Sequence, residues 1–402
     1  GGTLTYEDVT NIDSVGIITA RSNILVGSGI TLSPDGDIFA TGISTFSEGI
    51  ADNITINGIS VGKGANSVTN NTAVGLNALD ASVTGDENVA LGVNALTELT
   101  GGQSNTAVGG EALDSLTTGS TNTAVGSEAL DDCTTGSSNT AIGVNALQKN
   151  TTANYNTAVG RDALKLNTTG ASNNAFGGTS LDANTTGTYN NAFGNNALGS
   201  NTTANDNSAF GENALASNTT GARNTAVGSM ALDANTTANN NTAVGMKSMS
   251  VNTTGTQNAA LGTYSLENCT TGGDNTAVGY IALNNANGVQ NTAVGSRALQ
   301  DMTTGDDNVA VGYHALHTNT TASDNTAVGS HALYLNTTGN SNVAVGGNSL
   351  DANTTASNNT AVGYAALTSN TTGGNNTAVG NSSLFQNTTA SNNTAVGYAA
   401  LD

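Results

Sequence analysis

The apolar positions of this chain recur in a fixed pattern that fits neither a helix nor a plain alternating strand. The motif Asn-Thr-Ala-Val-Gly, or a close variant, begins at Asn71 and returns in twenty copies, the last of them at Asn393. The spacing is seventeen residues throughout, except for a step of sixteen from Asn275 to Asn291. A constant period of this length indicates a solenoid, in which each repeat packs on its neighbours.

Variation among the copies reports the environment of each position. If the motif's Asn is position 1, position 3 is Ala and position 5 is Gly in every copy. Such invariance indicates contacts too close for a larger group or, for Gly, a backbone conformation that other residues avoid. We therefore assign inter-chain contact or tight packing to these two positions, represented by Ala73, Ala90, Ala107, Gly75, Gly92 and Gly109.

Two further positions keep an apolar residue while its shape varies, as packed interiors do. Position 4 is mostly Val but is Phe in three consecutive copies, and position 9 is Leu in all but one. The sequence thus predicts a core that includes Val74, Leu79, Phe176, Phe193 and Phe210.

Position 12 is usually Asn, but other copies carry Leu, Met or, at Cys133 and Cys269, a cysteine. We expect this side chain to point inward, with Asn forming a hydrogen-bonded ladder between coils. The two cysteines lie eight coils apart and could not pair within one rod, so we interpret both as small buried hydrophobes.

The repeat favours a β coil. Positions 2 to 4 alternate, the following Gly ends a short strand, a second short segment is expected around Ala78 and Leu79, and an Asn-Thr-Thr-Gly turn closes the coil. Seventeen residues are too few for the paired helices of α-solenoids. We predict an all-β fold, a β-solenoid or β-roll of about twenty 17-residue coils, roughly 95 Å long.

A coil this poor in large side chains gains little from burial compared with the entropy lost in ordering it. We therefore expect a homo-oligomer, a homotrimer, with the invariant Ala of position 3 in contact between chains around a shared axis. The alternative is that this Ala only fits a narrow monomeric coil.

The first part of the chain lacks the repeat. Residues 1–66 are predicted to form a β-rich adaptor or collar, and residues 67–402 a rod with an irregular coil at 275–290. Strands are expected at Ser14–Ala20, Asn23–Leu32, Asp37–Phe46 and Asn53–Val61.

Charge narrows the range of partners. Eight Lys and Arg residues against 29 Asp and Glu residues give a net charge of -21, which repels nucleic acid and acidic membrane surfaces. No apolar stretch approaches the length of a membrane span, so no membrane insertion is expected.

Candidate chemistry is sparse, and we expect no enzyme and no cofactor. His314 and His331 share position 7 in adjacent coils, about 5 Å apart, a spacing that would allow a shared metal ion. A solvated pair is the interpretation that we favour. Acidic turns such as Asp86-Glu87, Asp306-Asp307 and Asp324 offer oxygen ligands for Ca²⁺ but do not recur in every coil. We favour solvated charge there too.

The Asn71-Thr72-Ala73-Val74-Gly75 motif and its successors resemble repeats of phage tail-fibre and bacterial adhesin-like proteins, and more distantly the head repeats of trimeric autotransporter adhesins. Thr5–Ile24 is similar to a module of marine phage, especially cyanophage, structural proteins. The resemblance implies a trimeric, left-handed nested β-roll on a virion or cell surface. It also implies partners among virion tail or baseplate proteins and, at the host, a surface glycan.

These observations predict the shaft of a virion appendage, a tail fibre that presents a host-recognition tip. The alternative is a bacterial cell-surface trimeric adhesin stalk or head, also extracellular. Ice binding is disfavoured, because the paired Thr residues of the closing turn are adjacent and would point to opposite faces.

Overall fold

The computed structural model describes residues 54–56 and 59–402. The chain divides into two compact units, Gly1–Ile50 and Ala51–Asp402, and all described residues belong to the second. The strands predicted at Ser14–Ala20, Asn23–Leu32 and Asp37–Phe46 therefore lie outside the described residues.

The described part is almost entirely β and turn. It opens with β1 (Ile54–Ile56), β2 (Ile59–Gly62) and a single 3₁₀ turn, η1 (Ala65–Ser67). Three-residue strands follow, one for each copy of the motif: β3 (Thr72–Val74), β4 (Val89–Leu91), β5 (Thr106–Val108), β6 (Thr123–Val125), β7 (Thr140–Ile142), β8 (Thr157–Val159), β9 (Asn174–Phe176), β10 (Asn191–Phe193), β11 (Ser208–Phe210), β12 (Thr225–Val227), β13 (Thr242–Val244), β14 (Ala259–Leu261), β15 (Thr276–Val278), β16 (Thr292–Val294), β17 (Val309–Val311), β18 (Thr326–Val328), β19 (Val343–Val345), β20 (Thr360–Val362), β21 (Thr377–Val379) and β22 (Thr394–Val396).

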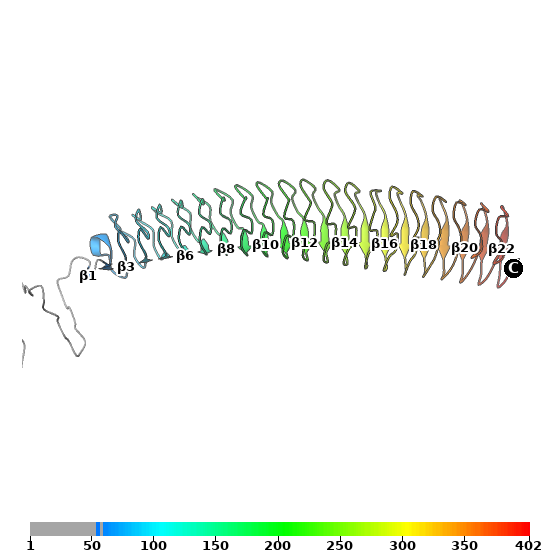
Figure 1. Ribbon diagram of the computed structural model, residues 1–402, viewed down its shortest axis with the longest axis horizontal. Helices are drawn as coiled ribbons and strands as arrows, with labels where there is room; N and C mark the ends of the chain where they lie inside the picture. The colour runs from blue at the N-terminus through cyan, green and yellow to red at the C-terminus, as the bar shows by residue number, and fades with distance from the viewer. Residues whose placement is uncertain (1–53, 57–58) are drawn as a thin grey trace, which may run out of the picture. The chain divides into compact units, whose positions relative to one another are not determined.

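Each strand from β3 to β22 pairs in parallel with the next, and like positions of the repeat face one another. Ala192 of β10, for example, pairs with Ala175 of β9 and with Ala209 of β11. The chain thus winds as a β-solenoid of about nineteen coils, with its single sheet on one side and turns on the other (Figure 1). The predicted fold class is confirmed.

Two details differ from the prediction. The region of Asn53–Val61 contains two strands, and β1 pairs antiparallel with β2, which in turn pairs antiparallel with β3. The segment around Ala78 and Leu79 is a turn, because positions 7 and 9 of each coil have positive φ angles, +57° at Asn77 and +51° at Leu79. Left-handed residues cannot continue an extended strand.

The short repeat at 275–290 leaves the sheet intact. Strand β15 keeps the register with β16, and Ala277 pairs with Ala293. This repeat is one residue shorter in its closing turn. There Asn287 accepts hydrogen bonds from the backbone N–H and the hydroxyl of Thr270, both at 2.8 Å. The predicted irregularity is therefore local.

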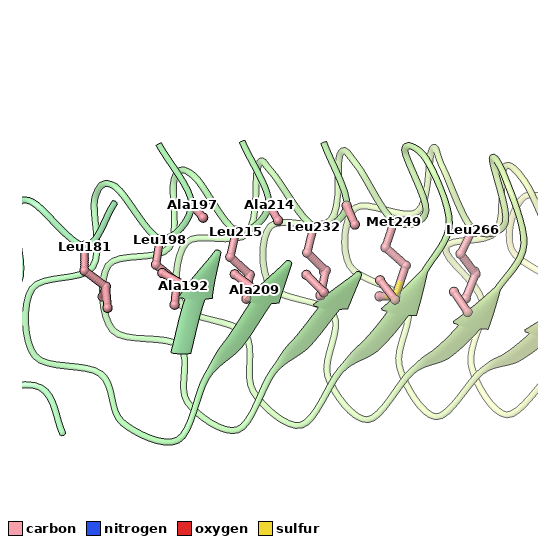
Figure 2. Packing of buried hydrophobic residues seen from close by; sticks show 14 of the residues in the cluster. Leu181, Ala192, Ala197, Leu198, Ala209, Ala214, Leu215, Leu232, Met249 and Leu266 are labelled. Carbon is pink, nitrogen blue, oxygen red and sulfur yellow. The ribbon is translucent and has the colours of Figure 1, made fainter. Parts of the chain in front are cut away.

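The core runs along the inside of the coils. The Ala of position 3 is the one inward-facing residue of each strand, and it packs against the Leu of position 9, which comes from the opposite wall (Figure 2). Leu79 is fully buried, as are Ala90 and Ala107, while Ala73 in the first coil is 3% exposed. The buried Ala and Leu residues form one continuous cluster along the coils, so the lumen is packed with small and medium side chains.

The core prediction for position 4 is wrong. Val74, Phe176 and Phe193 are only partly buried and Phe210 is 40% exposed, because neighbouring strand residues face opposite sides and position 3 faces the lumen. Apolar character is kept at position 4 on the outside of the coil.

Glycine at position 5 is required for two reasons. Gly75, Gly92 and Gly109 have φ angles between +139° and +145°, which only Gly adopts readily. A Cβ at Gly75 would also lie 2.2 Å from the carbonyl oxygen of Gly92 in the next coil. The end of each strand is therefore one of the places where the backbones of neighbouring coils lie too close for a side chain.

Candidate functional site

The outer face of the sheet carries an apolar row along the whole described rod. Positions 2 and 4 of every strand point outward, and no charged residue occupies positions 2, 3 or 4 in any of the twenty copies. We call the position-4 side chains of β3 to β22 the outer stripe. Its members are partly exposed: Val244, Val345, Val362 and Val379 are each 37% exposed, Leu91 is 45% exposed, and Val396 in the last coil is 71% exposed.

The stripe changes character in three adjacent coils. Phe176, Phe193 and Phe210 stack face to face, with ring centroids 4.6 and 4.8 Å apart and ring planes within 9° of parallel. The residues beside them at position 2 are Asn174, Asn191 and Ser208 instead of the usual Thr. The amide of Asn174 donates to the side-chain oxygen of Asn191 at 2.8 Å.

Two internal asparagine ladders hold this face in place. The position-12 ladder was expected: Asn201 Nδ2 donates to Asn184 Oδ1 at 2.9 Å, and the same contact recurs between neighbouring coils. The position-1 ladder was missed. Asn190 donates through its backbone N–H and its Nδ2 to Asn173 Oδ1, and through Nδ2 to the carbonyl of Ala204. The occurrence of Asn in every copy at position 1 was the available signal.

The Ala residues predicted to touch another chain do not lie at the surface. Ala90 and Ala107 are completely buried within their own coils. The inter-chain assignment of Ala73, Ala90 and Ala107 is therefore wrong, and the narrow-coil alternative describes them. If chains associate, the residues available on the sheet are those of positions 2 and 4.

The two position-7 histidines lie close together, in a tighter setting than a solvated pair. The ring centroids of His314 and His331 are 5.3 Å apart, and His317 lies 4.7 Å from His314. Tyr313 stacks on His314 at 3.9 Å, and Tyr334 closes the other side. His314 is only 9% exposed, and neither of its ring nitrogens has a hydrogen-bond partner.

Burial lowers the pKa of His314, and the neighbouring His317, His331 and Arg297 lower it further. Burial also lowers the pKa of His317, against the opposing effect of Asp301, whose carboxylate lies 3.6 Å away. Within residues 54–56 and 59–402, no three His, Cys, Asp or Glu side chains are placed to hold a metal ion. The rings of the three histidines and two tyrosines form an aromatic contact between coils.

Two carboxylates of the acidic turns make contacts along the rod. Asp306 accepts a hydrogen bond from the backbone of Val289 at 2.8 Å, and Glu87 accepts one from the hydroxyl of Ser104 at 3.0 Å. These two bonds link adjacent coils, so Glu87 and Asp306 contribute to the stacking of the turns.

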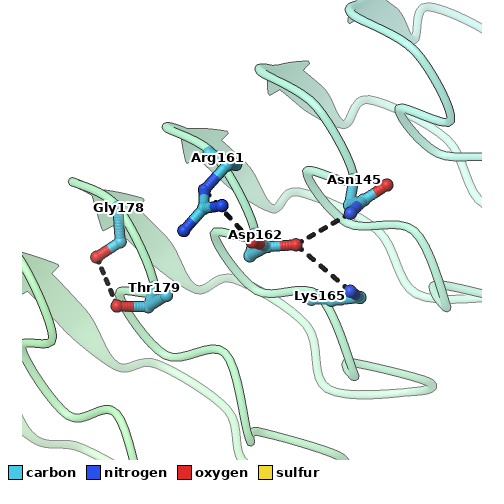
Figure 3. A network of polar contacts seen from close by, with 6 residues as sticks. All are labelled: Asn145, Arg161, Asp162, Lys165, Gly178 and Thr179. Carbon is cyan, nitrogen blue, oxygen red and sulfur yellow. Dashed lines mark hydrogen bonds and ion pairs between the residues drawn. The ribbon is translucent and has the colours of Figure 1, made fainter.

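Charged side chains on the remaining surface form small networks between coils. Asp162 accepts from Asn145 at 2.8 Å and pairs with Lys165 and Arg161 at 3.1 and 3.4 Å (Figure 3). The hydrogen bond from Asn145 is the first cause of the lowered pKa of Asp162. Asp131 shows the opposite effect, because burial and the surrounding carboxylates, Asp132 first, raise its pKa to about 6.

The cysteines occupy the position-12 ladder. Cys133 and Cys269 are both buried and unpaired, and burial raises the pKa of each thiol to about 11. The Nδ2 of Asn150 approaches the sulfur of Cys133 at 3.7 Å, so the thiol takes the place of an Asn in the ladder.

No protein family and no curated protein matches this sequence. In the part of the chain that the structure describes, no helix has the length and apolar character needed to cross a bilayer. The outer stripe is the main candidate site. Since no matching protein indicates its role, we interpret it from its geometry alone.

Proposed function

We propose that the chain is a structural, non-enzymatic fibre, the shaft of a virion appendage that presents a host-recognition tip. The observation that carries this proposal is the unbroken stacking of the strands from β3 to β22 in one register. At the usual strand spacing such a stack spans roughly 95 Å, and the same coil geometry repeats along that length. Such a stack is suited to act as a rigid spacer between the virion and the tip. The resemblance of Thr5–Ile24 to phage structural modules favours a location on the virion surface.

We further propose that the shaft consists of copies of this chain associated along the outer stripe, three in number as the resemblance implies. A partner that contacts every coil must have the same axial repeat, and a second copy has it by construction. A symmetry axis parallel to the rod would bring each copy's stripe to the same line. The face is free of charge, so the net charge of -21 stays on the outside of the bundle.

The area of the stripe supports the same conclusion. Twelve of the twenty side chains are at least 36% exposed. Together the twenty present on the order of 1,000 Å² per chain, comparable to what each partner buries in a stable complex. A continuous apolar row of this size is unusual on a monomeric surface. Association would also bury Phe210, which is 40% exposed on a single chain.

Light scattering on the purified chain tests the assembly. Three times the 39.6 kDa of one chain is expected for the wild type. The double variant Val345→Asp, Val362→Asp should dissociate, because it would bury charges without partners. The matched control Thr338→Asp, Thr355→Asp adds the same charge at exposed turn positions and should keep the wild-type mass. A monomeric wild type, or dissociation in both variants, contradicts the assembly.

A bacterial cell-surface adhesin stalk or head is the second candidate, favoured by the resemblance of the repeat to trimeric adhesin heads. Both candidates use the same rod and an extracellular setting. They differ in what the shaft joins, namely tail or baseplate proteins and a host surface glycan in the first, and a bacterial envelope in the second. Detection of the chain by antibody on purified virions or on cells distinguishes them.

A further inference from the structure

A uniform stripe cannot by itself align two copies of the chain. If the copies associate as proposed above, sliding one past another by one coil, about 4.8 Å, places an aliphatic side chain, usually Val, against another outside the Phe coils. The strands, the glycines and the ladders all repeat with the same period, so they offer nothing against such a slip. An ordered shaft needs a mark that occurs at one place in the stripe.

We propose that Phe176, Phe193 and Phe210 are that mark, and that they fix the register and the parallel direction of neighbouring copies of this chain. They form one continuous stack on the outer face, with ring centroids 4.6 and 4.8 Å apart. A phenyl ring projects farther from the sheet than the Val of other coils. Copies in register bring the aromatic stacks to the same levels, where ring contacts add to the burial of area.

A slip places these rings against shorter side chains. One coil of slip sets one ring of each chain against Val, and three coils separate the stacks completely. Each separated stack then holds the sheets apart at its own levels and leaves gaps beside it, which a packed interface does not tolerate well. The penalty therefore grows with the slip until the stacks no longer overlap.

The position of the stack along the rod also encodes direction. Strands β9, β10 and β11 are the seventh to ninth of the parallel strands that begin at β3 and end at β22. In a parallel pair, the stacks and all other coils match at once. In an antiparallel pair with its ends aligned, each stack faces Val and Leu coils of the partner. Matching the stacks instead would leave five coils of each chain uncovered.

The change at position 2 supports a special contact at these levels. Asn occurs at position 2 only at Asn174 and Asn191, the first two coils with a Phe. The hydrogen bond between their side chains lies on the same outer face as the rings. Polar amides beside a row of rings distinguish this patch from the Thr and Val surface of the other coils.

The test uses the full chain and two reporter variants, Val294→Cys and Val345→Cys, which lie three coils apart on the stripe, roughly 14 Å along the rod. The two variants are co-expressed and cross-linked with a short bismaleimide. Mass spectrometry then compares two products: same-site cross-links, which join position 294 to 294 or 345 to 345, and mixed-site cross-links, which join position 294 of one chain to position 345 of another. Cys133 and Cys269 are buried, so they do not compete.

In wild-type background, mixed-site cross-links should be rare. In the triple variant Phe176→Val, Phe193→Val, Phe210→Val, which restores the commonest residue of the stripe, the mixed-to-same ratio should rise at least about fivefold. Leu91→Val with Ile142→Val, which alters the stripe without removing a ring, should leave the ratio unchanged. A second variant places Phe at Val244, Leu261 and Val278 in the triple background and should restore the low ratio.

The two proposals can fail separately. If the wild type is a monomer by light scattering, the assembly itself is wrong. If the wild type and the triple variant are both oligomers with the same low mixed-to-same ratio, the assembly stands and the role of the phenylalanines is overturned. Failure of the transplanted rings to restore the register would also overturn it.

Discussion

Ala192 and Phe193 are neighbours on strand β10, yet the methyl group of Ala192 is completely buried in the coil while the ring of Phe193 lies outside it. Ala192 packs toward the Leu column of the lumen, and Phe193 stacks between Phe176 and Phe210. Two adjacent residues thus belong to two different rows of contacts, one inside the coil and one on its outer face.

This relationship predicts that Val has a large effect on stability at position 192 and a small one at position 193. Ala192→Val adds two methyl groups to a filled lumen and should lower the free energy of unfolding by about 1–3 kcal/mol. Phe193→Val places the usual residue on the outer face and should cost about 1 kcal/mol or less in a single chain, from lost ring stacking. Urea unfolding of both variants, under conditions where the chain is monomeric, measures the difference. Equal losses would contradict the assignment of the two faces.

The two asparagine ladders predict a second contrast. Asn190→Leu removes the side-chain acceptor and donor at position 1 and leaves the backbone N–H of Asn207 without its partner. The free energy of unfolding should therefore fall by roughly 3 kcal/mol. Asn201→Leu changes position 12, where Leu99 and Leu116 already fill the site, and should cost roughly 1 kcal/mol. Hydrogen exchange of the amides in the affected coils compares the two. A larger loss at Asn201 would contradict the ranking.

The sequence was sufficient to predict the solenoid, because a short repeat of constant length leaves one way to pair like positions. It was also sufficient for the crowded glycines and the position-12 ladder, since substitutions among copies showed what each site tolerates. It failed at Val74 and Phe176. Keeping an apolar residue while varying its shape is typical of an interior, but a long exposed stripe satisfies the same pattern. The two cases are distinguished by whether the side chain of Ala73 faces the lumen or the outside. The alternation of three residues does not reveal which face of the strand is inside.

The glycines of position 5 predict a steep cost for a single methyl group. At Gly143, φ is +136°, and a Cβ would lie 2.4 Å from the carbonyl oxygen of Gly160. Gly143→Ala should therefore destabilise its coils by about 3 kcal/mol or more, through strain and displacement of the neighbouring backbone. Gly110→Ala is the matched control, because its Cβ would meet only one atom, at 3.9 Å, and should change stability by less than about 0.5 kcal/mol. Thermal unfolding monitored by circular dichroism separates them.

The histidine cluster predicts local sensitivity to acid. The pKa of His314 is lowered in the folded chain from its ordinary value of 6.5. Below pH 6.5 the unfolded state therefore takes up a proton more readily than the folded state, and the free energy of unfolding decreases as the pH is lowered. Above that value His314 is neutral in both states and contributes no pH dependence. His314→Asn should reduce the loss, because Asn occupies the same position with the same backbone at Asn348, where φ is +57°. Hydrogen exchange of the coils from Arg297 to Tyr334 at pH 7 and pH 5 measures the effect.

The acid effect should depend on burial more than on charge. His331→Asn removes one neighbouring ring but leaves His314 buried against Tyr313 and His317, so most of the sensitivity should remain. An equal reduction in both variants would contradict burial as the main cause. Unchanged exchange between pH 7 and pH 5 in the wild type would contradict the pKa shift itself.

Asp131 predicts the opposite pH dependence several coils away. Its pKa is raised to about 6 from 3.8, so at pH 7 the folded state holds a carboxylate that burial and its acidic neighbours disfavour. That cost is present above about pH 6, is relieved as pH falls through this value, and disappears below 3.8, where both states are protonated.

Asp131→Asn should therefore raise stability at pH 7 by about 1 kcal/mol, a figure reduced for the solvent screening of a partly exposed group. The gain should vanish near pH 3.5. The exposed Asp206→Asn is the control and should change stability by less than about 0.5 kcal/mol at either pH. Urea unfolding at the two pH values decides the matter. A gain at Asp131 that persists at pH 3.5 would show that the amide stabilises the coil by hydrogen bonding, and that the cost of a buried carboxylate among acidic neighbours is not the cause.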